Sequence, residues 1–147
     1  PQSMVSLPSR AVYAILAVVD VAYHGGDDAV QSRDIAERQG IPHRYLEQIL
    51  CRLKRAGIVN AKRGPGGGYH LAKPPEAVRV SHILRGLLET EEAKGPKVDS
   101  PLARSIERSL REEVWSYFHR ITVSDLCREA EALGAAKARP KDIMYFI

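Results

Sequence analysis

Two short helical patterns separated by a glycine and a proline constrain the fold of this chain most strongly. The first, Ser32–Gln39, begins with a serine, and Asp34 and the following Glu37 suit the positive end of a helix dipole, so we expect a helix with Ser32 as its N-cap. Gly40 is typical of a left-handed C-cap, and Pro42 is tolerated where the next helix begins, which we expect to run to about Ala56. Two helices joined by so short a turn predict a helix-turn-helix.

The segment after Gly57 has a different pattern. The run IVNAKR, a glycine-rich turn and the run YHLAK predict two short strands joined by a loop. A hairpin directly after a helix-turn-helix is a wing. A nucleotide-binding P-loop is a poor alternative, because this loop lacks the Gly-Lys-Ser/Thr ending and the following helix. We therefore expect a mainly α fold with a small β-wing: a winged helix-turn-helix head plus a long dimerisation helix.

The rest of the chain is also expected to be helical. Pro8 and the run SRAVYAILAVVDVAYHGG predict a first helix that is apolar on nearly all sides, and therefore central and buried. Residues 81–89 predict a short helix with Ser81 as its N-cap, and Thr122 with Asp125 forms a variant capping box for the last helix. The expected domains are 4–89 for the DNA-binding domain, 90–100 for a linker, 101–134 for dimerisation helices and 135–147 for a C-terminal tail.

An apolar stripe runs along the predicted helix at 101–121. Its members recur every three or four residues, so they share one face about 30 Å long. Such a stripe has to be buried, and a helix linked to a small head commonly buries it against a two-fold mate. Packing on its own head is the alternative. The expected dimerisation residues are Leu102, Ile106, Leu110, Val114, Phe118 and Ile121.

The net charge of +4 is unevenly distributed. Residues 43–73 contain seven Lys or Arg and one acidic residue, Glu47, which gives +6 and leaves −2 for the rest of the chain. A basic block in a nearly neutral protein indicates a phosphate-binding face, although a merely solvated basic surface would look the same. Aromatic residues make up only 6%, which leaves little material for the stacking platforms that hold single strands.

The third predicted helix has two distinct faces. At 100° per residue, Leu46, Ile49, Leu50 and Leu53 fall on a core face. On the opposite face, arginine, glutamine and carboxylate side chains can read guanine, adenine and cytosine in a major groove, unless the face is simply solvated. This face holds Arg44, Glu47, Gln48, Cys51 and Arg55. Cys51 fits either a reactive thiol or a small neutral filler. Arg63, in the wing loop, can reach the narrow minor groove.

Catalysis, metal binding and membrane insertion are not indicated. The five histidines are scattered without a Ser/His/Asp, paired-carboxylate or HExxH arrangement, so we do not expect an enzyme. Cys51 and Cys127 are far apart and form no CxxC pair. No signal peptide is visible, and the longest apolar run, residues 11–23, is interrupted by Asp20 and too short for a bilayer. A cytoplasmic protein is therefore expected, with no membrane partner.

The run IAERQGIPHRYLEQIL followed by RLKRAGIVNAKRGPGGGYHLAKPP closely resembles the Rrf-two type of winged helix-turn-helix transcription regulators, the family that includes IscR, NsrR and CymR. The resemblance covers residues 4 to about 125, and the pair YLEQIL and RGPGGGY at this spacing carries it. By position it implies DNA contacts for a set of residues: Glu47, which would read bases; His43 and Arg44, at the start of the recognition helix; and Arg63, Gly64, Pro65 and Gly66, the minor-groove element of the wing.

The chain departs from this family in its cysteines. Cluster-binding members carry three cysteines between the linker and the long helix, whereas residues 89–115 contain none. An iron–sulfur cluster usually needs four thiolate or equivalent ligands, and neither Cys51 nor Cys127 substitutes by position. The chain therefore resembles the cluster-free branch of the family, and we expect no cofactor.

Together these patterns predict a homodimeric, sequence-specific DNA-binding regulator, a repressor that reads a palindromic operator in double-stranded DNA. A small molecule or a protein is the expected effector. Two alternatives remain open. One is a winged-helix module that binds a protein partner, and the other is a metal- or cluster-dependent redox sensor with non-cysteine ligands.

Overall fold

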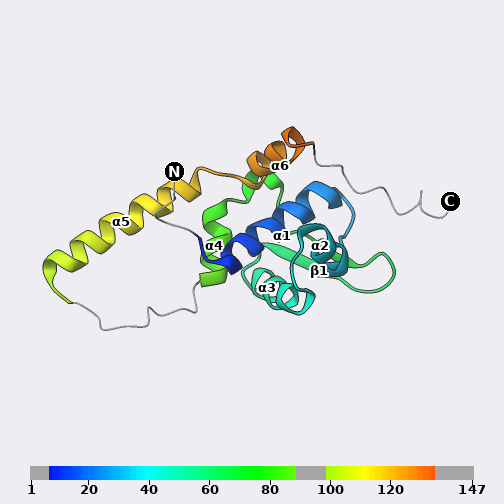
Figure 1. Ribbon diagram of the computed structural model, residues 1–147, viewed down its shortest axis with the longest axis horizontal. Coiled ribbons are helices and arrows are strands. Elements are labelled where there is room, and N and C mark those ends of the chain that lie inside the picture. The colour runs from blue at the N-terminus through cyan, green and yellow to red at the C-terminus, as the bar shows by residue number, and fades with distance from the viewer. Residues whose placement is uncertain (1–6, 89–98, 135–147) are drawn as a thin grey trace.

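The structure is a computed structural model that describes residues 7–88 and 99–134 (Figure 1). The predicted mainly α fold with a small β-wing is confirmed. Residues 90–98 of the predicted linker and the whole predicted tail, 135–147, lie outside the described residues. The elements in chain order are α1 (Ser9–Gly25), α2 (Ser32–Gln39), α3 (His43–Arg55), β1 (Val59–Lys62), β2 (Gly68–Leu71), the short 3-10 helix η1 (Pro75–Ala77), α4 (Val80–Leu88), α5 (Pro101–His119) and α6 (Val123–Ala132).

Helix α1 forms the centre of the head, as the sequence predicts. It contacts α2, α3, α4, α6 and β2. Ala11, Ala14 and Ala17 recur at helical spacing and are fully buried, so their small side chains let the neighbouring elements approach the helix closely. The helix ends at Gly25, and Gly26 follows with a positive φ of 54°. Among the described residues, no helix combines the length and the apolar character that a membrane span requires.

One carboxylate lies inside this core. The side chain of Asp20, on α1, is fully buried and accepts two hydrogen bonds from Arg38, from Nη2 at 2.8 Å and Nε at 3.0 Å. It also accepts a bond from Gln39 Nε2 at 2.8 Å. The hydrogen bond with Asp20 raises the pKa of Arg38. Because Arg38 and Gln39 lie in the last turn of α2, these bonds fix the first helix of the helix-turn-helix against α1.

Two predicted helix caps are wrong. The N-cap of α2 is Gln31, so Ser32 is the first residue inside the helix, and α4 begins at Val80, one residue before Ser81. Both serine hydroxyls bond to distant side chains instead of to their own helix. Ser81 is buried, and its Oγ lies 2.8 Å from His119 Nδ1 at the end of α5. The physical reason is that tertiary partners compete with the local backbone for a serine hydroxyl.

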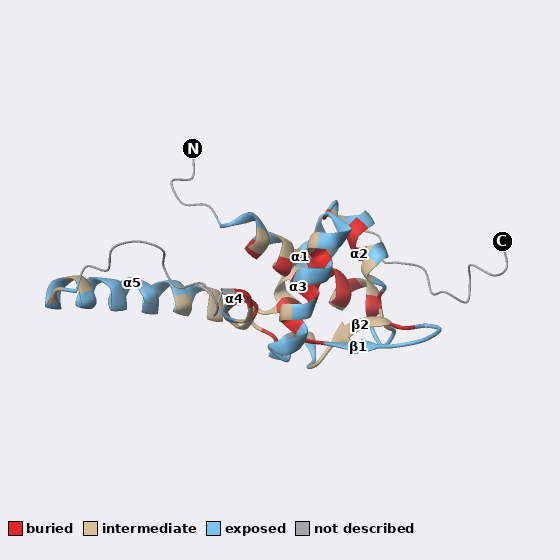
Figure 2. Cartoon of the chain, turned by 90° about the horizontal axis from the view of Figure 1, so that it is seen from below, coloured by how far each residue is buried: buried red, intermediate tan, exposed pale blue. Residues whose placement is uncertain are grey.

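Helix α5 projects away from the head (Figure 1) and is exposed over most of its length (Figure 2). None of its residues is buried. The first four members of the apolar stripe are largely solvent-accessible: Leu102 is 70% exposed, Ile106 50%, Leu110 62% and Val114 57%. Towards the other end of the helix, Phe118 packs against the head core. Leu102, Ile106 and Leu110 therefore do not pack on their own head, whereas Val114 lines a hollow together with Leu84 of α4.

The chain returns to the head after α5. The backbone N–H of Val123 donates to the Val78 carbonyl at 2.8 Å, and Ile121 packs against the core. Thr122 and Asp125 form the predicted capping box at the start of α6. Val123 is fully buried, and α6 contacts α1. The segment from Ile121 through α6, which we expected among the dimerisation helices, therefore contributes to the packing of the head.

Candidate DNA-binding surface

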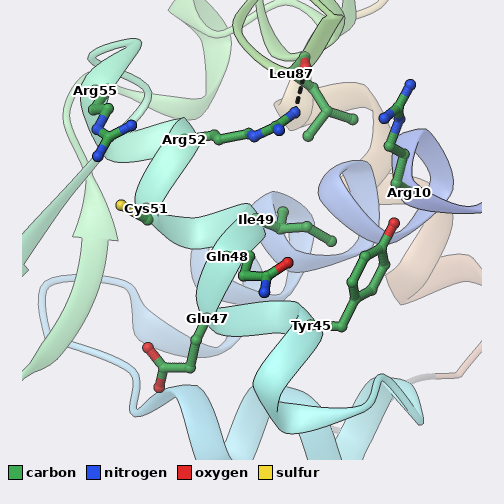
Figure 3. A pocket seen from close by; sticks show the side chains of 9 residues that line it. All are labelled: Arg10, Tyr45, Glu47, Gln48, Ile49, Cys51, Arg52, Arg55 and Leu87. Atoms are coloured by element: carbon green, nitrogen blue, oxygen red, sulfur yellow. Dashed lines mark hydrogen bonds between the residues drawn. The ribbon is translucent and has the colours of Figure 1, made fainter. Parts of the chain in front are cut away.

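The recognition helix α3 has the two faces that its sequence predicts. Its buried residues are the four expected ones: Leu46, Ile49, Leu50 and Leu53. Gly40, with φ 65° and ψ 32°, is the left-handed C-cap of α2 and lets the chain turn into α3. The outward residues are all exposed: His43, Arg44, Glu47, Gln48, Cys51 and Arg55. Figure 3 shows Glu47, Cys51 and Arg55 along one side of the helix.

An open hollow of about 560 Å³ lies beside α3 (Figure 3). Gln48 and Tyr45 line it together with Arg10 of α1. Arg52 also lines it, but its Nη1 donates to the Leu87 carbonyl at 3.1 Å and so joins α3 to α4. This one member of the basic block therefore has a structural bond, which the charge count did not reveal. The other six basic residues of the block are exposed: Arg44, Lys54, Arg55, Lys62, Arg63 and Lys73.

The wing is a two-stranded antiparallel hairpin in which Lys62 pairs with Gly68. Its loop residues Arg63, Gly64, Pro65 and Gly66 are exposed at the tip. Gly68 has φ 144°, and a Cβ at this position would lie 2.4 Å from the Val30 carbonyl oxygen. Only glycine fits here, because the backbone ahead of α2 passes this close.

A pair of backbone hydrogen bonds connects strand β2 of the wing to the segment just before α2. Val30 and Tyr69 exchange hydrogen bonds at 2.8 and 2.7 Å. Burial, and then the nearby Glu47 carboxylate and Cys51 thiol, raise the pKa of Tyr69. The two backbone bonds place β2 of the wing against the segment that leads into α2. Tyr69 is not among the residues that the sequence predicted for this surface.

The Glu47 side chain contacts two other side chains, one from each helix of the helix-turn-helix. Ser32 Oγ donates to Glu47 Oε1 at 2.7 Å, and His43 Nε2 lies 3.3 Å from the same oxygen. Ser32 Oγ and His43 Nε2 are themselves 3.1 Å apart. The sequence predicted places for His43 and Glu47 on this face but assigned Ser32 to a helix cap. The spacing of His43 and Glu47, four residues apart in a helix, was the available signal.

The comparisons with known proteins bear on what this surface does. Residues 7–129 match the Rrf2 family, described as iron-dependent transcriptional regulators. This chain belongs to the Rrf2 family. The transcriptional regulator IscR of Yersinia enterocolitica (serotype O:8 / biotype 1B) is 36% identical to this Rrf2 protein over 143 residues, which cover 92% of this chain and 87% of IscR.

Solved structures agree with this assignment. The IscR of T. potens superposes with a TM-score of 0.74 at 31% identity, covering 97% of each chain. CymR, the global cysteine regulator of B. subtilis, superposes with a TM-score of 0.70 at 25% identity, covering 86% of this chain and 98% of CymR. The predicted family and winged-helix fold are thereby confirmed. This Rrf2 protein is a DNA-binding transcription regulator and not an enzyme.

The donor set of this Rrf2 protein does not fit an iron–sulfur cluster, although the family description mentions iron. The sequence has two cysteines: Cys51 is exposed on α3, and Cys127 lies half-buried on α6. Within the described ranges, no three His, Cys, Asp or Glu side chains gather into a metal site. A cluster usually needs four thiolate or equivalent ligands. The two cysteines therefore fall short of the ligand set that a cluster needs.

Proposed function

We propose that this regulator binds operator DNA with α3 in the major groove and the wing loop at the adjacent minor groove. The observation that supports this arrangement is that six basic residues of α3, the wing and the segment that follows it are exposed. Arginine and glutamine side chains on α3 match guanine and adenine edges, and Arg63 at the wing tip matches the negative potential of a narrow minor groove. The proposed contact residues are His43, Arg44, Glu47, Gln48, Cys51, Arg55, Arg63, Gly64, Pro65 and Gly66.

We propose further that the regulator acts as a homodimer through α5. The exposed stripe on α5 supports this, because a run of apolar side chains as exposed as Leu102 and Leu110 is stabilised when a second copy covers it. A two-fold dimer places two recognition helices on two half-sites, so the operator should be an imperfect palindrome with half-sites about one helical turn apart or a multiple of it.

We propose that the bound dimer is a repressor. Repression requires only a tight complex that occupies the promoter, and a DNA-contacting surface with a dimer seam is enough for that. The test is transcription in vitro from a promoter that overlaps the selected operator. A fall in transcript with added protein supports repression, and a rise would show activation. Adding candidate small molecules and cell extract fractions to the same assay would identify an effector.

The first prediction concerns salt. If each subunit neutralises three or four phosphates, a dimer neutralises roughly 6–8, and log K should fall with log salt at a slope of about −5 to −7. Fluorescence anisotropy with an operator selected from a random duplex library measures this slope. A slope near zero would contradict the basic DNA interface and favour a module that binds a protein partner.

The second prediction separates Arg63 from Glu47. Arg63→Ala should weaken operator binding by about 1–3 kcal/mol, because it removes the wing-tip cation from the groove. Arg63→Lys is the matched control: it keeps the charge but loses the planar fork, so it should recover only part of the affinity. Glu47→Ala should instead relax base preference while affinity survives. Wild-type affinity and base preference in both alanine variants would show that the recognition surface lies elsewhere.

A further inference from the structure

We propose that Ser32 and His43 fix the Glu47 carboxylate in place and thereby make it a base-discriminating group in the major groove. The observation is the closed triangle that a serine of α2 forms with a histidine and a glutamate of α3. Ser32 and His43 are then positioning residues for specificity, and this inference rests on the proposed insertion of α3 into DNA.

The protons of the triangle can be assigned from its geometry. Ser32 has a single hydroxyl proton, which goes to Glu47 Oε1 at 2.7 Å. The contact of 3.1 Å between Ser32 Oγ and His43 Nε2 must then be made by a proton on Nε2. His43 Nε2 also lies 3.3 Å from Glu47 Oε1. The contacts of Glu47 with Ser32 and His43 therefore converge on Oε1, which leaves Oε2 as the oxygen that can face a base.

The three residues lie on the two adjacent helices of the helix-turn-helix. Ser32 is the first residue of α2, and His43 is the first residue of α3, one turn before Glu47. The far end of α2 is fixed to α1 through the buried Asp20. The Glu47 side chain remains 46% exposed, so a ligand can reach its carboxylate. The contacts with Ser32 and His43 restrict the rotamers of Glu47 before DNA arrives.

A fixed carboxylate discriminates better than a mobile one. It accepts from the N4 amino group of cytosine, whereas the acceptors of guanine and thymine would face a negative charge that cannot move away. An unrestrained glutamate can rotate out to water when the wrong base pair is present, and the mismatch is then tolerated. Releasing Glu47 should therefore improve binding to mismatched operators relative to the matched one.

The experiment measures a specificity ratio. An operator is selected from random duplexes with the wild-type protein, and Glu47→Ala identifies the base pair whose preference depends on Glu47. Dissociation constants are then compared for duplexes matched and mismatched at that pair. For Ser32→Ala we expect the ratio to fall by about tenfold, as for the loss of one directed base contact. Ser32→Thr, which keeps the hydroxyl, should restore the ratio. In a Glu47→Ala background, Ser32→Ala should change nothing further.

Other results would overturn the inference. An unchanged or increased ratio in Ser32→Ala would show that the triangle does not aim Glu47 at DNA. An equal fall in the Glu47→Ala background would assign the effect of Ser32 to another route. If a thermal melt shows that Ser32→Ala unfolds, His43→Leu is the second variant, with the same expected fall in the ratio. Because His43 is itself a proposed DNA contact, this fall must disappear in the Glu47→Ala background. A wild-type protein without any base preference would contradict the proposed function itself, whereas preference without a Ser32 or His43 effect contradicts only this inference.

Discussion

Leu110→Glu should raise the dissociation constant of the dimer by about a thousandfold or more and abolish operator binding at nanomolar protein. Leu110 lies in the middle of the α5 stripe and is 62% exposed in the single chain. In a two-fold seam each substitution occurs twice, and burying an unpaired charge costs about 3–5 kcal/mol. A monomer contacts only one half-site, so losing the dimer removes most of the operator affinity.

The matched control for this prediction is Ser105→Glu. Ser105 is exposed on α5, away from the stripe, and the substitution adds the same single charge. Sedimentation equilibrium and operator titration should show a dimer with wild-type binding for Ser105→Glu and a monomer for Leu110→Glu. Far-UV circular dichroism should show a folded head for both variants, because neither side chain lies in the head core, whereas loss of the dimer should lower the melting temperature of Leu110→Glu. A Leu110→Glu protein that remains dimeric, or a monomeric wild type at micromolar concentration, would contradict dimerisation through α5.

Asp20→Ala should lower the stability of the head by about 2–4 kcal/mol. Removing one partner of a buried ion pair costs about 3–5 kcal/mol, because the other charge stays uncompensated. The Arg38 side chain is 28% exposed and can partly recover its hydration, which places the expected loss at the lower end. For a chain of this length the melting temperature should fall by roughly 5–15 °C. Differential scanning calorimetry measures both quantities.

Two further variants sharpen this prediction. Asp27→Ala removes an exposed carboxylate just after α1 and should change the stability by less than about 0.5 kcal/mol. Asp20→Asn keeps the shape of the side chain but turns one oxygen into a donor that faces Arg38 and Gln39. Its loss of stability should therefore lie between those of Asp20→Ala and Asp27→Ala. Equal melting temperatures for Asp20→Ala and Asp27→Ala would show that the buried network contributes nothing to stability.

The order of the elements and the faces of α3 follow from local pattern. Gly40, the apolar spacing from Leu46 to Leu53 and the glycine-rich wing each depend on residues a few positions apart in the chain. Backbone conformation and helix periodicity act over that distance, so the sequence alone predicts them. The basic residues and the motifs that resemble the family lie in the same helix-turn-helix and wing segment, so both were predicted from the sequence.

Side-chain partners depended on the tertiary structure. A serine near a helix start satisfies the local rule for a cap, and only the approach of α3 to α2 gave the Ser32 hydroxyl the Glu47 carboxylate as a partner. Asp20 looked like an interruption in an apolar run until α2 brought Arg38 and Gln39 to it. Charge, burial and hydrogen bonding depend on distances between residues far apart in sequence, and the fold alone sets those distances.

A winged helix-turn-helix with basic residues on α3 and a long apolar stripe could be predicted from the sequence, because periodicity and turn chemistry are local properties. The folded structure was needed to show that the stripe is exposed from Leu102 to Val114, that α6 returns to α1, and that Glu47 contacts Ser32 and His43. These features arise from packing between distant segments, which no local pattern encodes.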